Sequence, residues 1–202
     1  MGVSMIKYSD LETVTMFVGL PGSGKTTIAA MLAKHCAKKH ILCWSNVPIK
    51  GTLQYDWFEH FGNFNLYPGL IILDEAGITT DNRNWEKNFN KDKTEFLKLL
   101  RHYHVKLVIF SQTWNDCDIK LRSMTSKLYI VKRSILPLTT KAIPVYRTID
   151  VDKETKEFKE LYSKDGLIFS LFSCKRCFRP LYYNMFDSWE APEKTSYNWE
   201  VY

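Results

Sequence analysis

The sequence lacks the features of a secreted or membrane-spanning chain. Lys7, Ser9 and Asp10 interrupt any apolar core near the amino terminus, so no secretory signal opens the chain. No run of about 20 apolar residues is present, which is the length that a membrane-spanning helix needs. The cysteines are odd in number and scattered, which argues against a disulfide framework and favours a reducing compartment; they are Cys36, Cys43, Cys117, Cys174 and Cys177. We therefore expect a cytoplasmic protein without a transmembrane segment of its own, with peripheral attachment to the inner face of a membrane as the alternative.

Acidic residues are missing from one long stretch. The chain has a formal net charge of +6, and no Asp or Glu occurs from Ile119 to Ile149. The basic residues of this stretch are Lys120, Arg122, Lys127, Lys132, Arg133, Lys141 and Arg147. A stretch of one sign could face DNA phosphates or an anionic membrane surface. It could equally form solvated sheet edges and loops, and both interpretations stay open here.

The strongest motif that is present is a phosphate-binding loop, G-x-x-x-x-G-K-T, at residues 19–26. It lies between an apolar run, Val14–Val18, and a helical pattern, Thr27–Lys39, which is the context that a Walker A loop requires. Its glycines let backbone N–H groups face an anion, and the helix directs its positive end at the phosphates. The predicted nucleotide-binding residues are Gly19, Pro21, Gly22, Ser23, Gly24, Lys25, Thr26 and Thr27. Lys25 adds a charge for the β- and γ-phosphates, and the Thr26 hydroxyl suits Mg²⁺.

An apolar strand that ends in two acids predicts the second part of the site. Gly69–Leu73 is continuously apolar, as in a buried central strand, and Asp74 and Glu75 follow it in a Walker B pattern. Asp74 can hold Mg²⁺, and Glu75 can polarise the attacking water as a general base. Guanine recognition would need Asn-Lys-x-Asp, but Asn90–Lys93 has its acid one place early. We therefore expect ATP with Mg²⁺.

Further polar residues could complete the site. Gln112 follows the apolar strand Val105–Phe110, whose carboxyl end opens on the same edge of a parallel sheet as Asp74. It could touch the γ-phosphate or the attacking water, or merely cap the strand. The arginines that could stabilise developing phosphate charge are Arg83, Arg101 and Arg122. The residues alone do not choose among them, and each could be a surface ion-pair residue.

Alternating strand and helix patterns over the first two-thirds of the chain predict an α/β fold. We expect a P-loop NTPase (RecA-like) domain with a mostly parallel sheet flanked by helices in residues 1–135. This core includes strands at Ile41–Trp44 and Leu128–Val131 and a helix at Lys93–His104. The polar segment Thr79–Lys93 is expected to be a loop or lid beside the nucleotide, or a surface loop.

The pattern changes in the last third of the chain. Residues 136–189 are expected to form a small β-rich extension packed on the same domain, and residues 190–202 a polar, disordered tail. The extension is predicted to contain strands at Ile143–Ile149, Leu167–Phe172 and Leu181–Met185 and a helix at Lys153–Tyr162. Cys174 and Cys177 have the spacing of half a zinc site, but no second pair follows at ligand spacing.

Several of these segments, in this order, resemble the ATPase domain of the zonular occludens toxin (Zot) family. That family includes filamentous-phage assembly ATPases and belongs with the DNA-pumping FtsK/HerA-type P-loop ATPases. The segments that carry the resemblance are Gly19–Thr27, Ser45–Pro48, Leu73–Glu75, Arg101-His102, Ser111-Gln112 and Asp118–Arg122. The resemblance implies Lys25 and Thr26 on the phosphates and Mg²⁺, Asp74 on Mg²⁺, Glu75 as catalytic base, Gln112 as polar sensor and Arg101 as arginine finger. Phage members usually continue into a transmembrane helix and an outer domain, which this chain lacks, so membrane anchoring is left open.

These observations together predict an ATP-hydrolysing motor of a phage or mobile element. It would move DNA, expected to be single-stranded, through phosphate contacts during virion assembly, packaging or extrusion. A finger supplied in trans needs a neighbour, so we expect a homo-oligomeric ring with coat or membrane-bound assembly proteins as further partners. Two alternatives stay open: a P-loop small-molecule kinase and a nucleotide-gated adaptor without catalysis. Glu75 counts against both, because it favours water as the acceptor and implies turnover.

Overall fold

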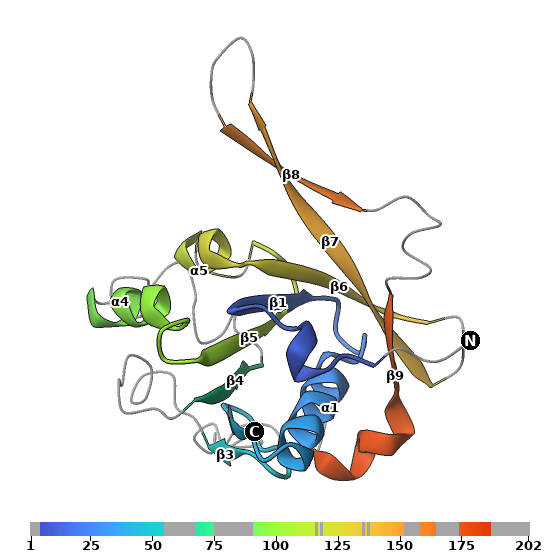
Figure 1. Cartoon of the computed structure of the whole chain (residues 1–202). Coiled ribbons are helices and arrows are strands. Elements are labelled where there is room, and N and C mark those ends of the chain that lie inside the picture. Colours follow the sequence, from blue (N-terminus) through green and yellow to red (C-terminus); the bar gives the residue numbers. More distant parts are fainter. Residues whose placement is uncertain are drawn as a thin grey trace, which may run out of the picture.

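Figure 1 shows the chain as a computed structural model, which describes residues 5–54, 68–74, 91–115, 117, 119–134, 136, 138–151, 158–164 and 174–186. Within these ranges the strands form one nine-stranded sheet in the order β3-β2-β4-β5-β1-β6-β7-β8, with β9 also paired to β7. The strands are β1 (Val14–Val18), β2 (Leu42–Ser45), β3 (Leu53–Gln54), β4 (Gly69–Leu73), β5 (Val105–Ser111), β6 (Lys127–Arg133), β7 (Thr139–Val151), β8 (Phe158–Lys164) and β9 (Lys175–Phe178). Strands β1 to β6 are parallel to one another, whereas β7 runs antiparallel to β6, β8 and β9.

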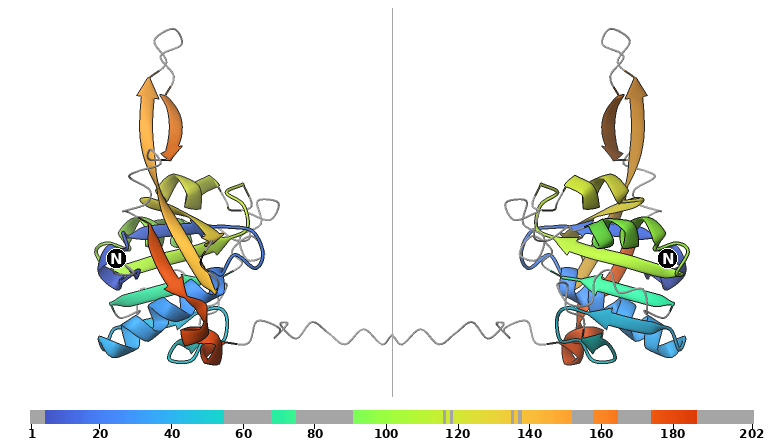
Figure 2. Two further views of the ribbon diagram at one scale, coloured as in Figure 1. Left: turned by 90° about the vertical axis from the view of Figure 1, so that its right-hand side faces the viewer. Right: turned by 90° about the vertical axis from the view of Figure 1, so that its left-hand side faces the viewer.

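Both faces of the central strands are buried, which explains their continuous apolar sequences. Successive residues of a strand face opposite sides of a sheet. Leu70 and Ile72 of β4 accordingly pack in one core cluster with α1, whereas Ile71 and Leu73 pack in a second cluster with α4 and α5. The helices are η1 (Tyr8–Asp10), α1 (Lys25–Lys38), α4 (Lys91–Leu99), α5 (Ile119–Met124) and η3 (Arg179–Met185). Figure 2 shows helices on both sides of the sheet.

The last third of the described chain differs from its sequence-based prediction at two elements. The predicted helix Lys153–Tyr162 is wrong where the structure describes it, because residues 158–162 belong to β8, which pairs with β7 from Val151↔Phe158 to Val145↔Lys164. The predicted strand Leu181–Met185 is also wrong, because these residues lie in the 3-10 helix η3 with a proline in its first turn. The predicted strand Leu167–Phe172 and the tail 190–202 lie outside the described residues.

Strand β7 connects the centre of the molecule to a projecting hairpin. Its first residues pair with both β6 and β9, and its last residues pair with β8 alone. Figures 1 and 2 show β7 and β8 extending away from the body.

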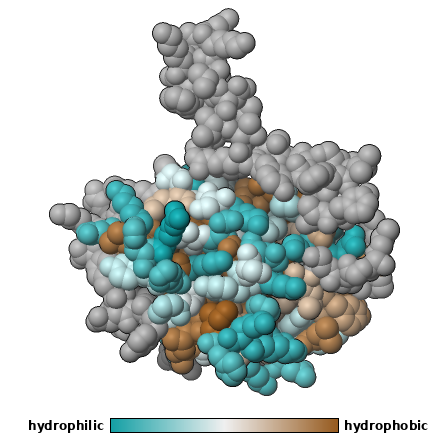
Figure 3. All heavy atoms as spheres, viewed as in Figure 1, coloured by the Kyte–Doolittle hydropathy of each residue, from teal (hydrophilic) through white to brown (hydrophobic). Residues whose placement is uncertain are grey.

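The 3-10 helix η3 lies on α1, where Lys34 Nζ donates to the Leu181 carbonyl at 3.4 Å. Leu181 is itself exposed, and Figure 3 shows hydrophobic surface over η3 at the lower right.

Candidate functional site

A loop of six residues joins β1 to α1 at the carboxyl edge of the sheet. Gly22 and Gly24 have φ angles of 71° and 99°, which lie in the left-handed region that glycine tolerates. Gly24 is the N-cap of α1, and the first helical bond runs from the Ile28 N–H to the Gly24 carbonyl at 3.1 Å. The N–H groups of residues 24–27 therefore have no acceptor within the helix. This is the arrangement that binds an anion at a helix N-terminus.

The Lys25 ammonium lies over the same loop. Its Nζ donates to the Gly19 carbonyl at 2.8 Å and reaches the Leu20 carbonyl at 3.5 Å, and the side chain is only 5% exposed. An ammonium carries three N–H donors. The loop thus combines unpaired helix amides with a fixed positive charge, and both favour a phosphate.

Thr26 and Asp74 come together although they are 48 positions apart. The Thr26 Oγ1 hydroxyl donates to Asp74 Oδ2 at 2.8 Å, and Asp74, at the carboxyl end of β4, is 4% exposed. A carboxylate and a hydroxyl in contact are hard oxygen ligands of the type that Mg²⁺ prefers. The residues present therefore fit Mg²⁺, and its binding by Thr26 and Asp74 stays a prediction.

Asn46 holds the backbone of Asp74 from the neighbouring strand. Its Nδ2 donates to the Asp74 carbonyl at 2.8 Å, and its Oδ1 accepts from the Asp74 N–H at 2.7 Å. The Asn46 N–H continues the ladder between β2 and β4 by donating to the Ile72 carbonyl at 3.3 Å. Sequence reasoning included Asn46 only as part of the family resemblance and gave it no role. In the structure, Asn46 positions the Asp74 backbone and thereby its carboxylate.

Replacing Asn46 by alanine should lower the free energy of unfolding by about 1–3 kcal/mol, because the partly buried Asp74 amide loses its partner. Urea unfolding measures this change, and ATP titrations at several Mg²⁺ concentrations measure whether the Asp74 carboxylate has moved. Asn184→Ala is the matched control, because Asn184 is exposed. An Asn46→Ala protein with wild-type stability and Mg²⁺ dependence would contradict the assigned role.

The other predicted site residues occupy different places. Gln112 follows β5 and is exposed, and the Gly19 N–H donates to the Ser111 carbonyl at 3.1 Å, so position 112 lies beside the start of the loop. Arg101 is exposed and precedes β5, at the amino edge of the sheet and so at the opposite edge from the loop. Arg122 donates from Nη1 to Asn115 Oδ1 at 3.2 Å. Glu75, Arg83 and most of the Thr79–Lys93 segment lie outside the described residues.

Three residues that sequence reasoning did not place in the site contact the loop. Arg133 Nε donates to the Gly22 carbonyl at 3.0 Å, and Arg179 Nη2 donates to the Ser23 carbonyl at 3.1 Å. The Thr140 hydroxyl also donates to the Ser23 carbonyl, at 3.0 Å. The sequence indicates Arg133 only as part of the basic stretch. These contacts join positions more than 100 residues apart, and no sequence pattern reports them.

Among the residues whose side chains the structure describes, the basic stretch is not confined to one edge of the sheet. Lys127 begins β6 and donates to the Asp10 carbonyl at 2.7 Å, whereas Arg133 ends β6 beside the loop. The two ends of one strand lie at opposite edges of the sheet. The side chains of Lys120 and Arg147 are outside the described set.

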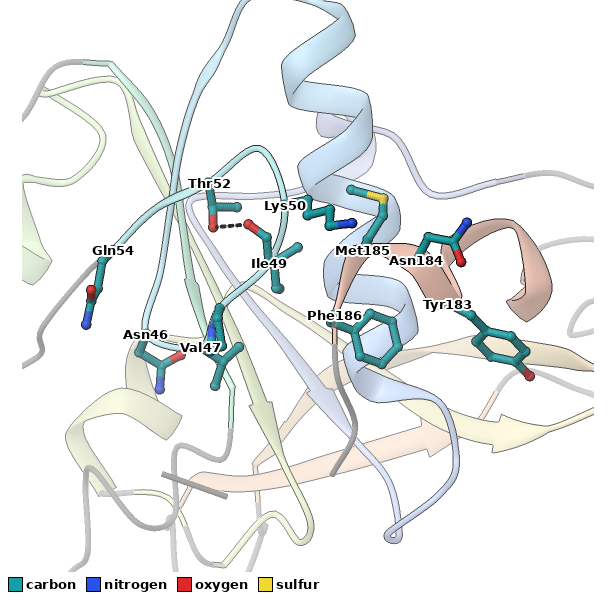
Figure 4. Close-up of a pocket in the computed structure, with 11 residues that line it drawn as sticks. Asn46, Val47, Ile49, Lys50, Thr52, Gln54, Tyr183, Asn184, Met185 and Phe186 are labelled. Atoms are coloured by element: carbon teal, nitrogen blue, oxygen red, sulfur yellow. Dashed lines mark hydrogen bonds between the residues drawn. The ribbon is translucent and has the colours of Figure 1, made fainter. Parts of the chain in front are cut away.

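A cavity of about 920 Å³ is lined in part by Asn46. It is formed by the β2–β3 connection and the end of η3, and these two segments are joined where the Lys50 N–H donates to the Met185 carbonyl at 2.8 Å. Figure 4 shows Val47 on the β2–β3 connection and Phe186 at the end of η3, on the two segments that line it. None of residues 19–26 lines this cavity, so it is distinct from the phosphate-binding loop.

The cysteine pair of the extension does not form a metal site with other described residues. Burial raises the pKa of the Cys177 thiol to about 12 and also raises the pKa of the Cys174 thiol. Cys177 packs in the core cluster that contains α1. In the described part of the chain, no group of three or more His, Cys, Asp or Glu side chains is placed to hold a metal ion. None of the helices described has the length and hydropathy of a membrane-spanning segment.

The parallel sheet, the glycine loop that opens α1 and the Asp74 strand end define a P-loop NTPase of the α/β class. A family model of the zonular occludens toxin (Zot) matches residues 47–164, which is more than half of the 202 residues. The protein therefore belongs to the Zot family, as its motifs predicted. The match includes Asp74 and Gln112 and begins after the phosphate-binding loop.

Solved structures confirm the fold class. The N-terminal domain of zonular occludens toxin from Neisseria meningitidis superposes with a TM-score of 0.57 and 14% identity, over 88% of this chain and 100% of that chain. B204, the DNA-packaging ATPase from Sulfolobus turreted icosahedral virus, has a TM-score of 0.50 and 12% identity, over 77% and 99%. B204 from Sulfolobus turreted icosahedral virus 2, in complex with ATP-gammaS, has a TM-score of 0.48 and 12% identity, over 76% and 98%. No curated protein matches the chain. At these identities the likeness to the first two structures shows the fold alone.

Proposed function

We propose that this chain is an ATP-hydrolysing motor that moves DNA for a phage or mobile element, acting in the host cytoplasm. The observation that carries the proposal is the hydrogen bond between Thr26 and Asp74, which brings the phosphate-binding loop and the acidic strand end into contact. Lys25, which lies over the loop, supplies the charge that favours a triphosphate. Membership of the Zot family supports the association with phages.

Each residue has a defined part in the proposed reaction. The amides of residues 24–27 and the Lys25 ammonium bind the β- and γ-phosphates, and Thr26 and Asp74 hold Mg²⁺. When bound, Mg²⁺ would neutralise negative charge on the phosphate oxygens. Glu75, next to Asp74, accepts a proton from the attacking water, and Gln112 orients that water. Asn46 keeps the strand end that carries both acids in place.

The proposed motor works as a ring. Arg101 precedes β5 at the edge of the sheet opposite the loop, so it can stabilise the transition state only at the site of a neighbouring subunit. B204, which has the same fold, is described as a DNA-packaging ATPase, and this supports DNA as the substrate that is moved. We propose that the DNA is single-stranded and is held through its phosphates.

Phosphate release from Mg-ATP, with and without single-stranded DNA, tests the proposal. We expect turnover that DNA stimulates, that EDTA abolishes and that Glu75→Gln lowers by at least about 100-fold. Glu95→Gln is the matched control, because Glu95 is exposed on α4. ATP binding without hydrolysis at any protein concentration would reject the motor and favour a nucleotide-gated adaptor. Phosphate transfer to an added small molecule in place of water would favour a kinase.

A further inference from the structure

The outer side of the phosphate-binding loop is held by three residues, Arg133, Thr140 and Arg179, which we call the loop brace. The Gly22 carbonyl accepts from Arg133 Nε at 3.0 Å and from Arg179 Nη2 at 3.3 Å. The Ser23 carbonyl accepts from the Thr140 hydroxyl at 3.0 Å and from Arg179 Nη2 at 3.1 Å. A carbonyl oxygen has two lone pairs, so the brace fully satisfies both carbonyls.

The brace acts on the same peptide groups that would bind phosphate. The Ser23 carbonyl and the Gly24 N–H belong to one peptide unit, and the Gly24 N–H has no acceptor within α1. Hydrogen bonds to a carbonyl polarise its peptide and strengthen the N–H on the other side. A charged donor such as a guanidinium does so more strongly than a neutral one. Arg179 therefore improves the loop as an anion site without touching the anion.

The brace also places two positive charges beside the loop, on Arg133 and Arg179. Among the described residues, the Arg179 side chain donates only to the two loop carbonyls and to the Thr140 hydroxyl, at 2.8 Å for the last. No carboxylate in that part of the chain accepts from Arg133 or Arg179. Two guanidinium groups beside the loop raise the local potential, and this favours a polyphosphate.

Arg179 is brought to the loop by the carboxyl-terminal part of the fold. It begins η3 directly after β9, and its backbone N–H donates to the Leu138 carbonyl at 2.9 Å. It lies 156 positions from Ser23 in the sequence. The loop is therefore complete only when the segment 174–186 is docked on β7 and α1.

We propose that Arg179 is a positioning residue of the ATP site, which acts with Thr140 through the carbonyls of Gly22 and Ser23 and makes residues 174–186 part of that site. The proposal rests on the proposed function, because it assumes that the loop binds ATP. It extends the nucleotide site from the loop at residues 19–26 to Arg179.

Titration of the full chain with a fluorescent ATP analogue and Mg²⁺ tests this role. We expect Arg179→Ala to weaken binding about tenfold and Arg179→Lys, which keeps the charge but loses the planar fork, to weaken it less. Arg176→Ala, which removes an arginine of β9 that makes no hydrogen bond to the described loop, should bind like the wild type. In Arg179→Ala, the affinity for inorganic tripolyphosphate, measured by competition, should fall by the same factor as the affinity for ATP. The effect acts through the phosphates, which the two ligands share. If Arg179 had only a structural role, Arg179→Ala would lower the melting temperature without lowering the affinity for ATP and tripolyphosphate.

The outcomes separate this inference from the proposed function. A folded Arg179→Ala protein that binds the analogue as tightly as the wild type overturns the role of Arg179. If Arg179→Ala does not fold, Thr140→Val decides, since it keeps the shape of the side chain and removes the hydroxyl that contacts Ser23 and Arg179. Wild-type affinity in Thr140→Val overturns the brace. Failure of the wild-type chain to bind the analogue overturns the proposed function, and this inference with it.

Discussion

Replacing Lys25 by alanine is expected to weaken ATP binding by about 100-fold or more while the fold is retained. The Lys25 ammonium is held 2.8 Å from the Gly19 carbonyl, within the loop that would surround the phosphates. A hydrogen bond to a charged group contributes about 1.5–3 kcal/mol, and one ammonium can bind two phosphate oxygens at once. Alanine is the best helix former, so α1 can still begin at this position. Titration with a fluorescent ATP analogue measures the loss.

Lys38→Ala is the matched control for this prediction. It removes the same charge from the same helix, but Lys38 is exposed in the last turn of α1, far along the helix from the loop. We expect its affinity for ATP to equal that of the wild type. If Lys25→Ala and Lys38→Ala bind ATP equally well, the loop at residues 19–26 is not the phosphate site, and the assignment that rests on it fails.

The parts of the site that lie on regular elements could be predicted from the sequence. Residues 69–73 are all apolar because β4 is covered on both faces, and such a run followed by two acids indicates a buried strand end. The loop at residues 19–26 has a local spacing that its own chemistry dictates. Parallel strands then bring Thr26 and Asp74 to one edge, which the structure shows as a hydrogen bond.

The parts that depend on contacts between distant segments could not be predicted. Asn46 and Arg179 act on the site through hydrogen bonds across 28 and 156 positions, and neither stands in a periodic or motif position that reveals its partner. For Arg101 the sequence points to the site and the fold does not. The family resemblance implies that Arg101 is an arginine finger, but in this chain it lies at the edge of the sheet opposite the loop.

The two incorrect elements have separate physical causes. Residues 153–162 are rich in Lys and Glu, which favour a helix, but β7 offers residues 158–162 a partner strand, and pairing overrides that weak preference. Residues 181–185 form a short segment that is apolar or aromatic except for Asn184, as in many strands. Pro180 precedes them, and its fixed φ angle and missing N–H suit the first turn of a helix.

Gly24→Ala is expected to lower the free energy of unfolding by roughly 2–5 kcal/mol. Gly24 has a φ of 99°, where an alanine costs about 1–2 kcal/mol, and a Cβ there would overlap the Thr140 hydroxyl. Its next contacts would be Thr140 Cβ and Cγ2, both at 3.1 Å, and Thr140 is fully buried and held by Ser23 and Arg179. Overpacking of this kind costs about 1–3 kcal/mol more. Urea unfolding measures the sum, and ATP binding should be lost as well, because the Gly24 amide is displaced.

Gly51→Ala separates the two contributions. Gly51 also has a left-handed φ, of 89°, but a Cβ there would meet only the Ala37 Cβ at 3.8 Å, which is an ordinary contact. It should therefore cost about 1–2 kcal/mol from backbone strain alone. The difference between the losses in free energy of unfolding of Gly24→Ala and Gly51→Ala then measures the cost of the contact between position 24 and Thr140. Equal losses would mean that the Thr140 side chain moves aside without cost, and they would contradict the tight packing of Thr140 against the loop.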